Sequence, residues 1–149
     1  MTSPRWVTAS IALLLSTGFV GPVGRPAQGM DLPVNVGAAT VNGLAQGVLV
    51  DVNGFTLYYL TSDTASTSAC TAECTHDRPP VLSDAVPPTP SSAPDVGFLG
   101  VAKDDNGSQV TYSGHFLYRF AGDHQIGDAH GEGAKGPQGG IWHVASPVM

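Results

Sequence analysis

The amino-acid sequence predicts a mainly β protein. We expect a small single domain of two related hairpin-containing repeats, a meander that folds into a sandwich- or barrel-like structure with Gly/Pro-rich loops. Only 12% of the 149 residues are charged, whereas 19 are glycine and 12 are proline, a balance that favours short strands and turns over long charged helices. An apolar and aromatic sequence around a glycine turn also occurs twice, and helical periodicity of useful length is confined to residues 6–20.

The repeat appears when residues 50–63 (VDVNGFTLYYLTSD) are placed over residues 110–123 (VTYSGHFLYRFAGD) with a constant offset of 60 residues. In each copy an apolar stretch precedes a turn that ends in glycine, and a second apolar and aromatic stretch follows it. This order is typical of a tight β-hairpin. We therefore expect one hairpin in each copy, over about residues 48–63 and 108–123.

Three further segments have the character of strands: residues 34–41, 98–102 and 141–144. The Asp, Asn and Gly residues of the segment 104–108 favour turn conformations, so the second half of the chain is predicted to be a meander. Residues 79–94 (PPVLSDAVPPTPSSAP) are predicted to form a loop between the repeats, because proline has no N–H group for the ladder of a central strand.

The N-terminus has the pattern of a secretory signal peptide. Arg5 precedes the apolar run 6–20, and in the segment 27–29 (AQG) Ala27 and Gly29 supply small residues at the two positions that a signal peptidase recognises. The apolar run is shorter than the roughly 20 residues that a membrane-spanning helix needs. We expect residues 1–29 to be cleaved and residues 30–149 to be secreted or to remain in the extracytoplasmic cell envelope. An uncleaved membrane anchor is the alternative.

The charge of the chain limits its partners. The formal net charge is −6 at pH 7, and residues 30–149 contain four basic residues against 12 acidic ones. Nucleic-acid surfaces need clustered Lys and Arg, so nucleic acid is excluded as a partner. The negative charge opposes adsorption to anionic lipid, which leaves an uncleaved signal segment as the membrane contact. The expected partner is an unknown envelope or extracellular molecule.

The chain contains two cysteines, Cys70 and Cys74. In an oxidising exported compartment two cysteines at this spacing favour an intramolecular disulfide, which contributes on the order of 2 kcal/mol for so small a ring. A redox role is the alternative, although the spacing is Cys-x-x-x-Cys rather than Cys-x-x-Cys. Neither cysteine lies near the end of the signal segment, so no acyl-anchor cysteine is predicted.

Taken together, these segments resemble a bacterial family of secreted repeats, often described as predicted lipoproteins with a Tyr-x-(Phe/Trp/Tyr)-x-x-Asp motif. The resemblance spans about residues 45–147. It rests on the two copies of the repeat, on CTAEC (70–74) followed by Pro79-Pro80, and on the segments GDAHGEG and IWHV. It implies an exported repeat protein of poorly defined function and assigns no catalytic residue.

The chain departs from the pattern of this family at two positions. Residues 118–123 (YRFAGD) match the motif fully, whereas the first copy has Leu60 at the aromatic position. Arg78 precedes the Pro-Pro pair, where the family usually has tryptophan.

The motif residues favour a structural role over a binding role. Tyr58 and Tyr118 lie on the predicted strands, where Tyr118 and Phe120 are expected to be buried on one sheet face. Asp63 and Asp123 follow where each strand has ended, and a carboxylate there accepts backbone N–H groups and fixes the turn. The alternative interpretation is that the two aspartates act as a pair of acids or as ligands for a cation.

The histidines provide a second candidate site. Four of the five histidines lie in the last 35 residues, in or near a Gly-rich stretch that includes His124, Asp128 and His130. Imidazole and carboxylate groups on one loop are ligands for Zn or Cu. The spacing matches no established metal motif, and a solvated polar loop is the simpler interpretation.

No sequence motif indicates an enzyme. The chain has no Gly-x-Ser-x-Gly turn, no phosphate-binding Gly-rich loop and no His-Glu-x-x-His segment. We expect an exported, non-catalytic binding or interaction protein without a firmly assigned cofactor. The alternative is an exported metal- or cofactor-binding protein, with a redox link, that uses the C-terminal His/Asp-rich loop.

Overall fold

The computed structural model describes residues 2–3, 34–83 and 99–149. Within these residues seven strands form three small antiparallel sheets, β1–β2, β3–β7 and β4–β5–β6. The strands are β1 (Asn35–Val41), β2 (Leu44–Val50), β3 (Tyr58–Leu60), β4 (Leu99–Asp104), β5 (Gly107–Tyr112), β6 (His115–Phe116) and β7 (Trp142–Val144). The helices are α1 (Cys74–Asp77) and a 3₁₀ turn at Pro137–Gly139.

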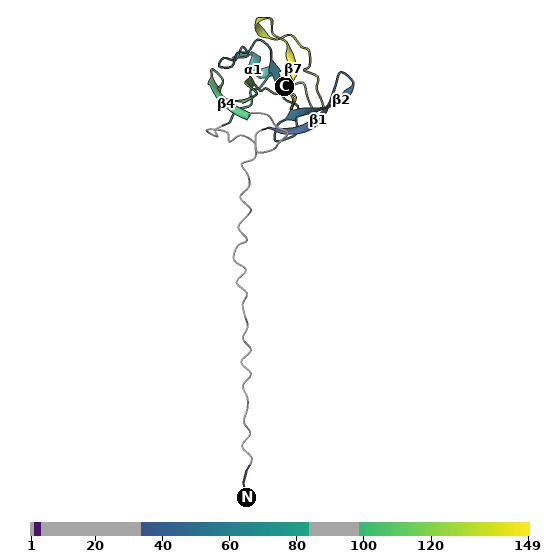
Figure 1. The fold of residues 1–149 in the computed structure, drawn as a ribbon, viewed down its shortest axis with the longest axis vertical. Helices are drawn as coiled ribbons and strands as arrows, with labels where there is room; N and C mark the ends of the chain where they lie inside the picture. Colours follow the sequence, from purple (N-terminus) through teal and green to yellow (C-terminus); the bar gives the residue numbers. More distant parts are fainter. Residues whose placement is uncertain (1, 4–33, 84–98) are drawn as a thin grey trace.

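The predicted fold class is confirmed, because the described part of the chain is mainly β, rich in hairpins and almost without helix. Its sheets do not close into a barrel. In Figure 1 the β1–β2 hairpin lies on one side, α1 and β4 lie on the other, and β7 lies between them. The predicted signal segment and the part of the predicted loop after Ser83 lie outside the described residues, apart from residues 2–3.

The first hairpin forms around the dipeptide Asn42-Gly43. Both residues have positive φ, 50° and 81°, which matches the turn that an Asn-Gly pair favours between two antiparallel strands. The hairpin of β4 and β5 closes more tightly than the predicted five-residue turn, since the strands extend to Asp104 and Gly107. Across the described ranges, no helix has the length and apolar character that a membrane crossing needs.

The two halves of the domain, residues 34–83 and 99–149, meet at Tyr58 and Tyr118. The N–H of each tyrosine donates to the carbonyl of the other, at 2.8 and 2.9 Å. Since the two residues hold the same position in the repeat, this contact lies on an approximate two-fold axis that relates the halves.

Each half places its last strand against the hairpin of the other half. β7, from the second half, pairs with β3 of the first half. Residues 79–83, from the first half, run along β5 and Tyr118 of the second half, with isolated bridges at Pro80 and Leu82. The segment predicted to be a loop therefore begins as an extended segment. Its contacts on the Tyr118 side use the carbonyl of Pro79 and the N–H of Val81, so the missing proline N–H groups are not required there.

The register of the two repeat hairpins, at residues 49–57 and 110–117, differs by one residue. The N–H of Leu57 donates to the carbonyl of Leu49, whereas the N–H of Leu117 donates to the carbonyl of Val110. Equivalent residues are thus 60 positions apart after the turn and 61 before it. The first turn accommodates the additional residue because the buried Asp51 carboxylate accepts the N–H groups of Asn53 and Phe55.

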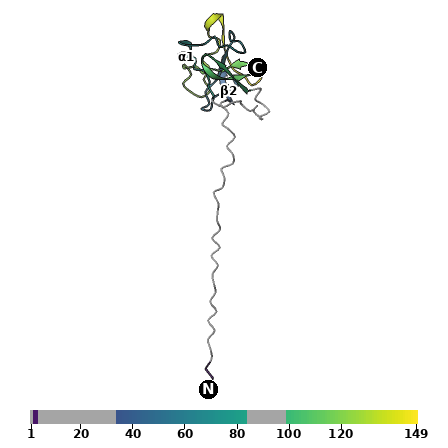
Figure 2. The same cartoon turned by 90° about the vertical axis from the view of Figure 1, so that its left-hand side faces the viewer.

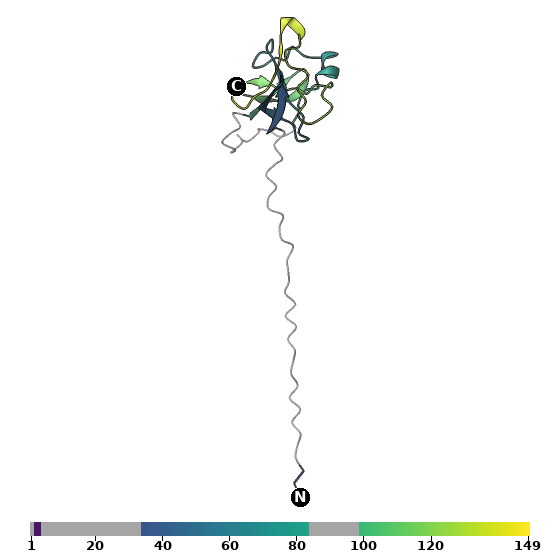
Figure 3. The same ribbon diagram turned by 90° about the vertical axis from the view of Figure 1, so that its right-hand side faces the viewer.

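The core lies between the halves and contains residues from both. One cluster includes Leu57, Val81, Val110, Leu117 and Ala145, and a second includes Tyr58, Leu60, Cys70, Phe116, Tyr118 and Trp142. Figures 2 and 3 show the central strands from two opposite sides, with α1 at the periphery in both views. The interior is therefore an interface between the two repeats.

Candidate functional site

The tyrosines and aspartates of the repeated motif form two hydrogen-bonded pairs. The Tyr58 hydroxyl donates to Asp123 Oδ2 at 2.5 Å, and the Tyr118 hydroxyl donates to Asp63 Oδ2 at 2.8 Å. Each tyrosine thus binds the aspartate of the other half. Both tyrosine side chains are fully buried, so these hydroxyls hold the halves together in the interior.

The second oxygen of each aspartate binds the loop that follows it. Asp63 Oδ1 accepts the N–H of Ala69 at 2.7 Å, and Asp123 Oδ1 accepts the N–H of His130 at 2.9 Å. Both carboxylates are therefore engaged by one tyrosine and one backbone donor. The accepted N–H groups lie six and seven residues beyond the aspartates, so each carboxylate holds the following loop rather than the turn at the end of its own strand.

Burial changes the proton affinity of these groups. Burial raises the pKa of Tyr58 and of Tyr118 far above the ordinary value for tyrosine. The hydrogen bond to Asp123 raises the pKa of Tyr58 further. Burial also raises the pKa of Asp63, while the bonds that Asp63 accepts from Ala69 and Tyr118 oppose this effect.

Alkaline titration should separate Tyr58 and Tyr118 from exposed tyrosine. An unfolded tyrosine ionises near pH 10, so a raised folded-state pKa favours the native state below pH ~10 and this stability is lost as the pH rises further. We expect tyrosinate absorbance from these two residues to appear together with the loss of far-UV circular dichroism. Tyr58→Phe and Tyr118→Phe, each of which removes one of these signals, are the controls. Reversible ionisation of all tyrosines in a folded protein would contradict the assignment.

Arg78 is a buried cation enclosed by aromatic rings. Only 3% of it is exposed. Its guanidinium carbon lies 4.0 Å from the ring centroid of Phe120, 4.5 Å from that of Trp142 and 5.1 Å from that of Tyr58. A planar guanidinium stacks on such rings, which offsets part of its desolvation cost. Phe120, predicted to be buried, is half-buried at the outer side of this cluster.

The guanidinium of Arg78 has fewer hydrogen bonds than its donors allow. Nη2 donates to the carbonyl of Gly131 at 3.3 Å, while Nε and Nη1 have no hydrogen-bond partner among the described residues. The carboxylate of Asp77 lies 3.9 Å from Nε and is 70% exposed. Burial accordingly lowers the pKa of Arg78.

Sequence reasoning marked Arg78 as a departure from the family and missed its position. Val81 lies between Leu117 and Val110 as Ala145 lies between Leu57 and Leu49, which makes Arg78 the counterpart of Trp142. The chain therefore has a cation at one of two equivalent positions and an aromatic ring at the other.

The predicted disulfide between Cys70 and Cys74 is present. It closes the segment that brings Ser68 against Tyr118, whose hydroxyl lies 2.5 Å from Ser68 Oγ. Cys70 is fully buried and belongs to the cluster of Tyr118 and Trp142. The disulfide therefore stabilises one side of the aromatic interior. A disulfide ring of this size contributes about 2 kcal/mol to the stability of the folded protein.

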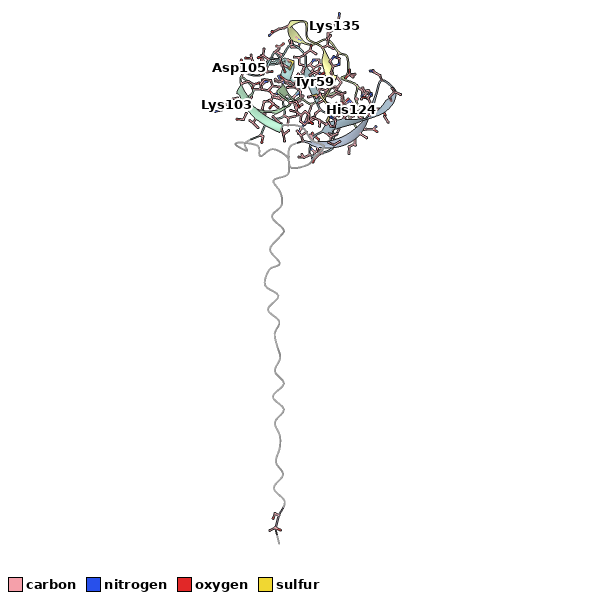
Figure 4. All side chains as sticks on the ribbon, viewed as in Figure 1. Tyr59, Lys103, Asp105, His124 and Lys135 are labelled. Carbon is pink, nitrogen blue, oxygen red and sulfur yellow. A yellow bond between two sulfur atoms is a disulfide. The ribbon has the colours of Figure 1, made fainter. Side chains whose placement is uncertain are left out.

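Three of the candidate ligand residues converge in the loop after the second hairpin. His130 Nδ1 lies 3.5 Å from Asp123 Oδ1 and 3.7 Å from Asp128 Oδ2. One ligand atom from each of the three lies within 4.8 Å of the others. His124 does not contribute its ring to this group; its N–H donates to Asp128 Oδ2 at 3.0 Å and lowers the pKa of that carboxyl. In Figure 4 His124 lies beside the β1–β2 hairpin, away from Lys103 and Asp105.

Two open grooves adjoin this loop and share Asn42 and Glu132. The larger has a volume of about 620 Å³ and the smaller about 280 Å³. Their walls carry hydrogen-bonding side chains from the first hairpin, the loop after Asp123 and β7. The larger groove is lined by Thr40, Asp128 and His130, among others, and the smaller by Gln46, Tyr59, His143 and Ser146, among others.

Glu132 and His143 form an oriented pair in the smaller groove. His143 Nδ1 lies 2.8 Å from Glu132 Oε1, and Glu132 Oε2 accepts the N–H of Val144 at 2.6 Å. The ring of Tyr59 packs against His143 and His115, with centroid separations of 5.7 and 4.8 Å. Sequence reasoning did not select this cluster, because its four members come from four separate segments.

Comparison with known families gives one match. The model of a family described as a secreted repeat of unknown function matches residues 100–146, which is less than half of the chain. The match covers one complete copy of the repeat, from β4 to β7, and supports an extracellular location in general terms. No curated protein and no solved structure matches the chain.

Proposed function

We propose that the chain is an exported, non-catalytic binding or interaction module whose ligand lies in the two adjoining grooves. The observation that carries this proposal is the contrast between two kinds of polar residue. The Tyr–Asp pairs of the motif are enclosed between the halves, whereas the groove side chains around Asn42 and Glu132 are open to a ligand. The similarity of residues 100–146 to secreted repeats supports export.

Capture of the partner from the extracytoplasmic fraction of the producing cells tests this proposal. Asn42→Gly removes a side chain common to both grooves and keeps a residue that tolerates its φ of 50°. Ser113→Gly is the matched control, because it makes the same change in a turn with a φ of 49° that does not line the grooves. The double variant Asn42→Gly/Glu132→Gln should lose a species that the parent and Ser113→Gly retain. Equal capture by all three contradicts the proposal.

Divalent-cation binding is the second candidate function. It is favoured by the convergence of His130, Asp123 and Asp128, whose chemistry suits Zn or Cu. The ring of His130 is 65% exposed and can turn toward an ion without disturbing the core. Against this role, both oxygens of Asp123 already accept hydrogen bonds from Tyr58 and His130.

A metal titration of variants separates the two candidates. If the loop holds an ion, the melting temperature of the chelator-treated parent should rise saturably with Zn or Cu, because a ligand bound to the native state stabilises it. His130→Ala should lose this rise while retaining the backbone N–H that Asp123 accepts. His124→Ala, which alters a neighbouring ring outside the group, should keep it. Metal-independent melting of all three proteins assigns the loop a structural role.

A further inference from the structure

A small hollow lies beside Phe120, outside the two grooves. It has a volume of about 210 Å³, and its apolar walls come from Phe55, Pro79 and Phe120. Arg119 and the exposed Ala121 lie at its edge. Its residues come from the turn at 51–55, from Pro79 in the segment that the first half contributes to the second, and from residues 119–123, beside which that segment runs.

The approximate symmetry shows what is missing from this hollow. Arg119 is the counterpart of Tyr59, Phe55 of His115 and Pro79 of His143. In the other half, three rings pack side by side at these positions, with Tyr59 in the middle. Among the three equivalent positions at the hollow, Phe55 is the one aromatic ring, and the guanidinium of Arg119 takes the middle position. This replacement leaves room for a planar group.

Arg119 is held in a fixed position at the hollow. Its Nε lies 2.8 Å from Asp51 Oδ2, and Asp51 is 2% exposed and anchored by two backbone donors at its other oxygen. The described contacts use only Nε, so both Nη nitrogens of Arg119 retain their donors. The side chain is 44% exposed, which makes these donors accessible.

The other charges around the hollow leave hydrogen-bond donors in excess. The carboxylate of Asp123 already accepts from Tyr58 and His130 at its two oxygens. Behind the ring of Phe120 lies the buried guanidinium of Arg78, 4.0 Å from the ring centroid, with two nitrogens that lack hydrogen-bond partners. Asp51 Oδ2 has no hydrogen-bond partner among the described residues and forms its ion pair with Arg119 Nε at 2.8 Å. Two guanidinium groups thus flank a hollow whose two carboxylates are each hydrogen-bonded or ion-paired within the protein, and this arrangement is complementary to an anion with an apolar body.

We propose that this hollow binds a small aromatic carboxylate. The ring of the ligand packs against Phe55, Pro79 and Phe120, in the place that a histidine ring takes in the other half. Its carboxylate accepts hydrogen bonds from the Nη nitrogens of Arg119. Because the hollow shares no lining residue with the grooves, this site and the proposed function stand or fall independently.

Benzoate is the probe, since it is a single-ring acid suited to the volume of the hollow. A ligand of this size with one charged contact should bind with a Kd on the order of 1 mM. In amide NMR spectra of the protein, benzoate should give saturable shifts at Phe55, Phe120 and Ala121. Benzamide, which has nearly the same shape without the charge, should bind about tenfold more weakly. Absence of saturable shifts, shifts that map elsewhere, or equal binding of benzamide overturns the proposal.

Two variants test the contacts and leave the interior intact. Arg119→Lys keeps a cation for Asp51 but lacks the planar fork, and Ala121→Leu fills the edge of the hollow. Each should weaken benzoate binding several-fold. Ala45→Leu, the same change at an exposed alanine of β2, should bind benzoate as the parent does. The dispersion of the amide spectra reports that each variant is folded. Parent-like affinity in both Arg119→Lys and Ala121→Leu overturns the proposal.

Discussion

Trp142→Ala is expected to lower the free energy of unfolding by about 3–5 kcal/mol, the range for removing a large aromatic side chain from a core. Trp142 is 2% exposed, and its ring packs edge-on against Tyr118 at 4.9 Å. It also covers the guanidinium of Arg78 at 4.5 Å. The substitution therefore removes apolar burial, an aromatic contact and part of the environment of a buried cation together.

Urea unfolding followed by circular dichroism measures this loss. Trp142→Phe keeps an aromatic face over Arg78 and should lie between the parent and the alanine variant. Leu44→Ala, at a residue that is 67% exposed, should change the stability by less than about 0.5 kcal/mol. An unchanged midpoint and slope for Trp142→Ala would show that the ring is not part of the core.

Asp123→Ala is expected to lower the free energy of unfolding by about 2–4 kcal/mol, because it leaves one buried donor and one partly buried donor without an acceptor. One is the hydroxyl of Tyr58 and the other is the N–H of His130. Asp123→Asn should be milder, since its carbonyl oxygen still accepts one of the two. The unfolding free energies of the three proteins, measured after chelator treatment, test this order.

A double-mutant cycle with Tyr58→Phe isolates the bond between the halves. The double variant should be less destabilised than the sum of the single changes, with a coupling on the order of 1 kcal/mol, because Tyr58→Phe removes one of the donors left unpaired. The equivalent cycle of Tyr118→Phe and Asp63→Ala is the internal control. Strict additivity in both cycles would contradict the crossed pairing.

The elements that local chemistry determines were predictable from the sequence. Glycine turns between apolar stretches predicted the mainly β class, and the spacing of Cys70 and Cys74 predicted their disulfide. The position of Asp63 and Asp123 after each strand favoured a turn role, whereas their backbone contacts, with Ala69 and His130, lie six and seven residues further along the chain, in the following loops.

Features that depend on which strands pair were not predictable in the same way. A repeat shows that two segments fold alike, but pairing within a half and pairing between halves satisfy the same alternation of apolar residues. The one-residue difference in register between the two repeat hairpins could not be read from the sequence either. The aligned sequences are regular across the turn, while the carboxylate of Asp51 stabilises a longer loop in the first half.

Arg78 and the Pro79-Pro80 pair show the limits of reasoning from residue type. Proline predicted a loop because of its missing N–H, yet on the Tyr118 side the segment needs only the carbonyl of Pro79 and the N–H of Val81 for its contact with the second half. Arginine is rarely buried, and its burial here depends on rings supplied by the other half. The candidate metal group likewise depended on the loop conformation, which placed His130 with the aspartates and His124 outside them.

The exchange of closing strands means that one repeat is not a self-sufficient folding unit. A chain with a single copy would have a hairpin without its closing strand and a tyrosine without its aspartate partner. Its own closing strand would have no hairpin to pair with. Two identical chains of this kind would complete one another through a two-fold interface, as in a domain-swapped dimer. Covalent linkage of two copies replaces that dimer by an intramolecular contact, independent of protein concentration. The linkage also allows the two halves to differ in sequence, as they do at the hollow beside Arg119 in one half and at the stacked rings around Tyr59 in the other.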